Sequence, residues 1–176
     1  MTVTIRAATD RDMPWVLNQN NEAAPAVNAL SMDQLSQLVS KTSAFRIAEI
    51  DGRPVGFLLA MTEGADYGSM NFQWFKAHYD QFVYIDRVVI AASSRRLGVG
   101  RVLYADIHSY TERTAPVLTC EVNLHPPNPG SVRFHSVYGF REVGQQDTEG
   151  GAKRVSLLAL EVPEYAYVSG REAPQS

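Results

Sequence analysis

The sequence predicts a mixed layer fold, in which helices pack against one sheet that contains both parallel and antiparallel strands. Two observations lead to this class: short β-branched or alternating runs recur along the chain, and amphipathic helical segments separate them. The order of the elements is β-α-α-β-β, an aromatic segment, and then β-α-β-α-β-β, which is typical of α+β or mixed α/β proteins. With 176 residues the chain is about one domain long. We expect residues 1–163 to form that domain and residues 164–176 to be an irregular C-terminal tail.

A strand and two helices are expected first. Residues 3–7 are a short run of β type. Thr9 and Asp12 both suit a helix N-cap, and Pro14 favours Asp12 because proline is tolerated in the first turn of a helix. The pattern Ser-Met-Asp-Gln at residues 31–34 is that of a capping box, and it predicts a second helix from this point.

A hairpin and an aromatic insertion follow. Residues 45–50 alternate in polarity, Asp51-Gly52 is a turn signal, and residues 55–61 are a continuous apolar run typical of a buried strand. Residues 62–80 form an insertion that is dense in aromatic side chains. Because aromatic rings bury large areas, we expect this insertion to pack over something, either as a lid on a substrate site or as a contact in a homodimer.

The second half of the chain alternates strands and helices. A central strand is predicted over 82–90, a loop over 91–100, and a helix whose apolar face includes Val99, Leu103 and Ile107. The remaining expected elements are a strand over 117–124, a helix over 131–137 that ends at Gly139, and strands over 140–144 and 155–162 with Gly150-Gly151 between them.

Composition excludes several classes of protein. The formal net charge is −3, whereas a general nucleic-acid binder usually carries a basic excess. No apolar run approaches the roughly 18–20 residues of a membrane span, and the first residues lack a secretory signal, so we expect no membrane partner and a cytoplasmic location. The single cysteine, Cys120, can form neither an internal disulfide nor a thiolate zinc cluster, and no metal site is predicted.

The stretch from Arg95 to Arg101 is the most informative about function. It joins a predicted strand to a predicted helix and contains Gly98 and Gly100. Unpaired N–H groups at a helix start, the helix dipole and the missing Cβ of glycine together favour a bound phosphate. A Rossmann fingerprint would need a glycine at position 103, where the chain has Leu103, and no P-loop ending occurs. A pyrophosphate carried by neither fold remains, and coenzyme A is the obvious candidate.

Two motifs resemble those of the GNAT acyltransferases. Arg95-x-x-Gly98-x-Gly100 after a β-branched strand resembles the family's pyrophosphate-binding motif, Arg/Gln-x-x-Gly-x-Gly/Ala. Residues 128–140, Asn-Pro-Gly-Ser-Val-Arg-Phe-His-Ser-Val-Tyr-Gly-Phe, are similar to the family's Asn-x-x-small-x-x-x-Tyr-x-x-x-Gly-Phe segment. The resemblance extends over roughly residues 3–162, because the order of elements also matches. It implies a central mixed, largely antiparallel sheet of about six or seven strands, flanked by about four helices.

The resemblance also implies which residues would bind the coenzyme. Main-chain groups of the strand end would bind the pantetheine arm, the N–H of Val89 would donate to the thioester carbonyl, and the glycine-rich loop would cradle the pyrophosphate. The implied set is Val88, Val89 and Ile90 in the strand, Arg95, Arg96, Leu97, Gly98, Val99, Gly100 and Arg101 in the loop, and Asn128, Ser131 and His135 on the second helix.

Three residues are candidates for catalysis. Asp86 lies two residues before Val88 and is the first choice for a base that deprotonates the amine. The alternatives are an ion pair with a neighbouring cation and an outward-facing position on the strand. Tyr84 shares that strand face and would help to position substrate or water. His135 stands where the family usually has a tyrosine that acts as general acid, so it either donates the proton itself or leaves the thiolate to depart unaided. The alternative is a helix-surface histidine that packs on Tyr138 or faces solvent.

The sequence therefore predicts an acyl-CoA-dependent N-acyltransferase. It would transfer an acetyl group from acetyl-CoA to a primary amine of a small molecule or peptide, by direct attack in a ternary complex. Three alternatives stay open: a longer or succinyl donor, a retired fold that binds acyl-CoA as a sensor or scaffold, and an interaction module whose loop merely resembles the motif. The sequence does not name the acceptor.

Overall fold

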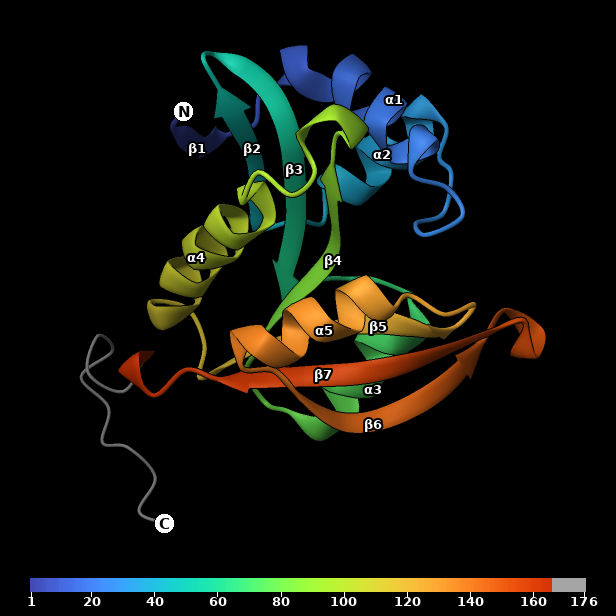
Figure 1. Ribbon diagram of the computed structural model, residues 1–176. Helices are drawn as coiled ribbons and strands as arrows, with labels where there is room; N and C mark the ends of the chain where they lie inside the picture. The colour runs from blue at the N-terminus through green and yellow to red at the C-terminus, as the bar shows by residue number, and fades with distance from the viewer. Residues whose placement is uncertain (166–176) are drawn as a thin grey trace. The chain divides into compact units, whose positions relative to one another are not determined.

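Seven strands and five α-helices make up the described part of the chain, residues 1–165 of a computed structural model (Figure 1). Residues 166–176, most of the expected tail, lie outside the described residues. The elements are β1 (Val3–Ala7), α1 (Met13–Glu22), α2 (Met32–Val39), β2 (Ala44–Ile50), β3 (Arg53–Thr62), α3 (Met70–His78), β4 (Val83–Ile90), α4 (Val99–Glu112), β5 (Val117–His125), α5 (Pro129–Tyr138), β6 (Arg141–Thr148) and β7 (Lys153–Glu161). Short 3-10 turns occur at η1 (Asp10–Asp12), η2 (Ala92–Ser94) and η3 (Glu149–Gly151).

The strands follow the order β1-β2-β3-β4-β5-β7-β6 in one sheet. The pairs β1–β2, β2–β3, β5–β7 and β6–β7 are antiparallel, whereas β4 and β5 run parallel. The predicted mixed, largely antiparallel sheet is therefore confirmed. The described residues form two compact units: the first comprises residues 1–65 and 85–109, and the second comprises residues 66–84 and 110–165. No helix within residues 1–165 combines the length and the apolar character needed to cross a membrane.

The first unit is built on the predicted hairpin. Asp51 (φ 51°) and Gly52 (φ 72°) both adopt the left-handed backbone that a two-residue hairpin turn requires. The apolar run that follows is buried throughout, from Val55 to Met61. As predicted, the side chain of Ser31 accepts the N–H of Gln34, and the Gln34 side chain accepts the N–H of Ser31, so the capping box opens α2.

Helices cover both faces of this hairpin. Arg46 of β2 forms an ion pair with Asp106 of α4 at 2.9 Å, whereas the ring of Phe57 in β3 meets Trp15 of α1 edge-on at 6.4 Å between centroids. Phe57 pairs with Ile47, the residue after Arg46, and successive side chains of a strand point to opposite faces. Helices α4 and α1 therefore lie on opposite sides of β2 and β3.

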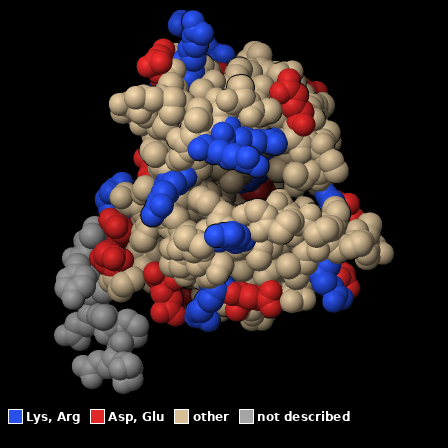
Figure 2. All heavy atoms as spheres, viewed as in Figure 1, with Lys and Arg blue, Asp and Glu red and all other residues tan. Residues whose placement is uncertain are grey.

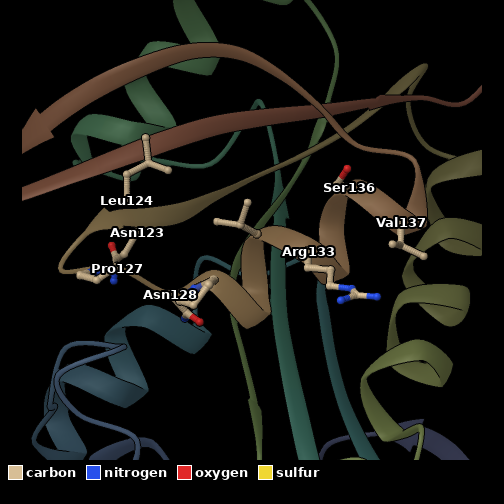
Figure 3. A pocket seen from close by; sticks show the side chains of 9 residues that line it. Asn123, Leu124, Pro127, Asn128, Arg133, Ser136 and Val137 are labelled. Carbon is tan, nitrogen blue, oxygen red and sulfur yellow. The ribbon is translucent and has the colours of Figure 1, made fainter.

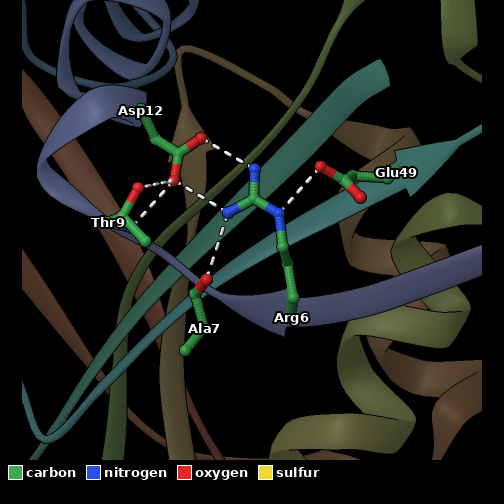
Figure 4. A network of polar contacts seen from close by, with 5 residues as sticks. All are labelled: Arg6, Ala7, Thr9, Asp12 and Glu49. Carbon is green, nitrogen blue, oxygen red and sulfur yellow. Dashed lines mark hydrogen bonds and ion pairs between the residues drawn. The ribbon is translucent and has the colours of Figure 1, made fainter. Parts of the chain in front are cut away.

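A partly buried ion pair lies at the start of α1 (Figure 4). Both terminal nitrogens of Arg6 donate to the carboxylate of Asp12 at 2.8 Å, and its Nε donates to Glu49 at 2.8 Å. The N–H and hydroxyl of Thr9 also donate to Asp12, at 2.8 and 3.1 Å. Asp12 is the N-cap residue of α1, as predicted, but its side chain accepts no capping hydrogen bond from the described residues of the helix, because Arg6 and Thr9 donate to its carboxylate. These donors hold the pKa of Asp12 at about 2, the Arg6 hydrogen bond being the main cause.

The aromatic insertion contains a helix that the sequence analysis did not assign, so the described chain has five helices rather than about four. Ser69 caps α3, and the rings of Phe72 and Phe75 are fully buried, in contact with the rings of Phe82 and Tyr84. The insertion thus supplies part of the core of the second unit.

Two close contacts complete the second unit. Figure 1 shows α5 and α3 on opposite faces of the sheet formed by β5, β7 and β6. A Cβ at Gly144 of β6 would lie 2.7 Å from Trp74 of α3, so glycine allows the indole to pack on the strand. Helix α5 begins at Pro129, two residues earlier than predicted, because Asn128 accepts the N–H of Ser131 and caps it.

Candidate functional site

The end of β4 and the start of α4 are packed closely onto β3. A Cβ at Gly56 of β3 would lie 3.0 Å from Cδ1 of Ile90, 3.1 Å from the carbonyl oxygen of Val89 and 3.3 Å from Cγ1 of Val99. The N–H of Ala91 also donates to the carbonyl of Val55 at 2.9 Å. The strand end predicted to bind pantetheine is therefore held firmly in place from one side.

The loop that follows presents a row of free backbone donors. Within residues 1–165, none of the N–H groups of residues 95–101 donates a hydrogen bond to another protein group. The loop turns through left-handed backbone at Arg96 (φ 65°) and Gly98 (φ 81°), and α4 starts at the buried Val99. A Cβ at Gly98 would meet no heavy atom within 4 Å. Free amides, an open approach and a helix start together form an arrangement that can bind an anion.

Basic side chains surround these amides. Arg95, Arg96 and Arg101 are all exposed, and none of them forms an ion pair with a described residue. Figure 2 shows basic side chains gathered near the segment that joins β4 to α4. Their charge attracts a polyanion over a longer range than the amides do.

Asp86 of β4 is buried in an ion pair. Its Oδ2 accepts a hydrogen bond from Nε of Arg87 at 2.7 Å, and the two side chains are 4% and 9% exposed. Arg87 also donates from Nη1 to Oδ1 of Asn20 at 2.9 Å. The alternative considered for Asp86, a pair with a neighbouring cation, is thus present in the structure, and Asp86 stays the predicted base.

Tyr84 lies in the second unit and carries a hydrogen bond that the sequence analysis missed. Its hydroxyl donates to Oε1 of Glu121 in β5 at 2.8 Å, and its ring is fully buried. Tyr84 and Thr119 are also paired in the parallel register of β4 and β5. A carboxylate hydrogen-bonded to a tyrosine can act in proton transfer, so Glu121 joins the candidate residues.

Asn128, Ser131 and His135 lie close together at the N-cap and the first turns of α5. Asn128 caps the helix, and the hydroxyl of Ser131 lies 3.4 Å from Nδ1 of His135. Nδ1 of His135 also lies 2.7 Å from the carbonyl oxygen of Ser131. Because a carbonyl can only accept, we assign the ring proton to Nδ1. His135 is 5% exposed, and burial lowers its pKa, against a smaller opposing effect of the Ser131 hydrogen bond.

A hollow of about 450 Å³ lies along the same helix (Figure 3). It extends from the end of β5 to the second half of α5, and Asn128 and Arg133 supply polar groups at its edge. The lining residues are Asn123, Leu124, Pro127, Asn128, Pro129, Val132, Arg133, Ser136 and Val137. Its walls are mostly apolar.

Each unit thus collects one part of the predicted site. The first unit contains Asp86, the strand residues 88–90 and the loop 95–101, whereas the second contains Tyr84, Asn128, Ser131 and His135. The sequence analysis did not identify Arg87 and Glu121. Each is a charged residue inside a mostly apolar strand, and this pattern could have identified them, because a charged residue needs a partner when it is buried.

Comparisons with known proteins identify the family and the fold. A profile of the acetyltransferase (GNAT) family matches residues 9–140. No curated protein matches the chain. Among solved structures, the ribosomal-protein-S18-alanine N-acetyltransferase from Escherichia coli has a TM-score of 0.71 at 15% identity, covering 99% of this chain and 98% of that one.

Two further structures show the same fold. Ard1 from Thermoplasma volcanium has a TM-score of 0.73 at 18% identity, covering 92% of this chain and 99% of that one. Arabidopsis thaliana NAA60, in complex with a bisubstrate analogue, has a TM-score of 0.70 at 16% identity, covering 91% and 98%. Because the family profile matches most of the chain, the chain belongs to the GNAT family of acetyltransferases.

Proposed function

We propose that this protein transfers an acetyl group from acetyl-CoA to a primary amine. The observation that carries the proposal is the row of free N–H groups over residues 95–101, beside three exposed arginines. A diphosphate offers the charge and the acceptor oxygens that such a loop can satisfy.

The remaining coenzyme contacts follow the family pattern. Backbone groups of residues 88–90 would bind the pantetheine arm as an added strand would, and the N–H of Val89 would donate to the thioester carbonyl. Asn128 and Ser131 would contribute further contacts to the coenzyme. The close packing at Gly56 supports these roles, because a strand end packed tightly on its neighbour presents its N–H groups in a well-defined arrangement.

The reaction needs one base and one leaving group. The amine nitrogen attacks the thioester carbon, the amine loses a proton, and the C–S bond breaks to release coenzyme A as a thiolate or thiol. Asp86 is the proposed base. Glu121 is a second candidate, supported by its hydrogen bond from the hydroxyl of Tyr84.

The geometry of His135 favours one of the two roles left open for it. With the proton on Nδ1 and a lowered pKa, the neutral ring has no proton on Nε2 to donate near pH 7. We therefore propose that His135 accepts a hydrogen bond and that the thiolate departs without a proton from this residue.

The acceptor class is proposed from chemistry and from the similar structures. Any primary amine that reaches the thioester carbon in its neutral form would serve as nucleophile. Two similar structures are named as acetyltransferases of ribosomal-protein alanine, and another is named as a complex with the bisubstrate analogue CoA-Ac-MVNAL. We propose a free α-amino group of a peptide as the first acceptor to test, with small amines next.

Binding of coenzyme A is tested first, by calorimetry on wild type and two glutamate variants. Gly98→Glu places a negative side chain beside the free amides, and we expect it to weaken coenzyme A binding about 100-fold or more. Gly150→Glu is the matched control, because Gly150 has a similar φ of 66° and open space at its Cβ but lies in the turn before β7. The proposal fails if wild type does not bind coenzyme A, or if both variants lose binding equally.

Turnover is tested next, by release of free thiol. Acetyl-, propionyl- and succinyl-CoA are each mixed with peptides that begin with alanine, serine or methionine and with a panel of small amines. Tight coenzyme binding without turnover would favour the sensor alternative, and faster turnover with a longer donor would replace acetyl-CoA in the proposal.

The base is assigned by two further variants. Asp86→Asn is expected to lower kcat about 100-fold, with coenzyme A affinity within about twofold of wild type, because it removes the proton acceptor and leaves the loop intact. Glu121→Gln is the comparison. The variant with the larger loss of kcat identifies the base, and an unchanged kcat in Asp86→Asn would remove Asp86 from the mechanism.

A further inference from the structure

A polar cluster, buried except at Asn21, joins β4 to the segment between α1 and α2, residues 23–31. Arg87 is its centre: Nε donates to Asp86 at 2.7 Å, and Nη1 donates to the side-chain oxygen of Asn20 at 2.9 Å. The same nitrogen reaches the carbonyl oxygen of Asn28 at 3.4 Å. The amide of Asn20 donates to that carbonyl at 3.0 Å. We name Asp86, Arg87, Asn20 and Asn21 the clasp.

The far end of the segment is held by Asn21. Its side-chain nitrogen donates to the carbonyl of Leu30, and its side-chain oxygen accepts the N–H of Leu30, both at 2.9 Å. The side chains of two adjacent asparagines at the end of α1 therefore hold the segment at Asn28 and Leu30. These contacts replace the regular backbone pairing that a connecting segment lacks.

Burial makes the clasp sensitive to its central residue. Asn20 is fully buried, and the side chains of Asp86 and Arg87 are almost fully buried. A buried charge needs a partner, and the planar guanidinium can serve a carboxylate, an amide oxygen and a carbonyl together. The compact ammonium group of lysine offers no such fork.

The position of the clasp connects it with the proposed reaction. Arg87 directly precedes Val88, and the proposed donor to the thioester carbonyl is the N–H of Val89. At about 3.3 Å per residue, two steps along the strand separate Arg87 from that donor by about 7 Å. Within the first unit, the segment that Arg87 holds is thus close to where the acceptor amine would approach.

We propose that Arg87 is a positioning residue for the acceptor. It holds the segment 23–31 against β4 and orients the carboxylate of Asp86, so acceptor binding depends on it and coenzyme binding does not. The roles of the acceptor and the coenzyme rest on the proposed function, whereas the clasp itself rests on the contacts described above.

Hydrogen exchange of the full chain tests the clasp without reference to activity. Arg87→Met and Asn21→Ala should each raise the exchange rate of amides in residues 23–31 by about tenfold or more. Arg46→Met is the matched control, because it breaks another ion pair of the same unit, between Arg46 and Asp106, and should leave this segment unchanged. Exchange within about twofold of wild type in both clasp variants would overturn the proposal.

Two variants allow the clasp to be tested even if Arg87→Met does not fold. The double variant Asp86→Asn/Arg87→Met removes both charges together, so no single buried charge is left behind. Asn21 is exposed, so Asn21→Ala loosens the segment without disturbing the core. The same rise or absence of a rise in the exchange rate of amides in residues 23–31 then decides the result from these two variants.

Kinetics test the role in the reaction, with acetyl-CoA and a peptide that begins with alanine. Asn21→Ala and Arg87→Lys should raise the KM for the peptide about tenfold, with the Kd for coenzyme A within about twofold of wild type. An unchanged KM, or an equal loss of coenzyme A affinity, would overturn the positioning role. A wild type that binds coenzyme A but acetylates no panel amine would also overturn it. Absence of coenzyme A binding would instead remove the proposed function, and hydrogen exchange would still decide whether the clasp holds the segment.

Discussion

The ion pair between Arg6 and Asp12 should make the stability of this protein depend on pH in the acid range. The Arg6 hydrogen bonds, with those from Thr9, lower the pKa of Asp12 from 3.8 to about 2. At about 1.36 kcal/mol per pH unit, this difference corresponds to about 2.4 kcal/mol of stability. The side chain of Arg6 is 37% exposed, so solvent screening reduces the effect, and we expect about 1–2 kcal/mol.

The direction follows from proton binding. Between pH 3.8 and about 2 the unfolded chain binds more protons at this residue than the folded chain does. The stabilisation is therefore complete above about pH 4 and is lost as the pH falls through 2. Removing the carboxylate by Asp12→Asn should abolish the stabilisation at neutral pH and should matter little near pH 2.

Urea unfolding of wild type and Asp12→Asn at several pH values from 7 to 2 measures this difference. Asp147→Asn is the matched control, because Asp147 also pairs with an arginine at 2.7 Å but both side chains are about half exposed. We expect a smaller change from it, since exposed pairs are screened. Equal unfolding midpoints for wild type and Asp12→Asn at pH 7, or a gap that persists unchanged to pH 2, would refute the reasoning.

Two further predictions concern the second unit. Gly144→Ala should destabilise the protein by about 1–3 kcal/mol, because its Cβ would lie 2.7 Å from the indole of Trp74; urea unfolding measures the loss, and adding Trp74→Leu should recover part of it if the contact is the cause. Burial lowers the pKa of His135, so the unfolded chain binds more protons there, and stability should fall as the pH drops below about 6.5. The urea midpoint between pH 8 and 5 measures this, and His135→Gln should flatten the dependence; an identical pH profile for the variant would exclude His135 as its source.

Local chemistry allowed much of the fold to be predicted from the sequence. The capping box at Ser31, the Asp-Gly turn at residues 51–52 and the stop at Gly139 each depend on neighbouring residues alone, and all three were confirmed. The predicted order of elements was also confirmed, because the polarity pattern of each segment depends on residues that are close in sequence. The helix in the aromatic insertion was missed, because the burial of its rings depends on tertiary contacts with Phe82 and Tyr84.

Part of the candidate site was also predictable from the sequence, and part was not. The sequence by itself determined the loop from Arg95 to Arg101, since glycine spacing and basic residues are local features. The same loop motif indicated the family. Tertiary structure decided that the amides of this loop are free, that Asp86 is paired with Arg87 and that Glu121 accepts from Tyr84. Those facts depend on which elements pack together and on which charges they bury, and neither follows from residue spacing along a chain.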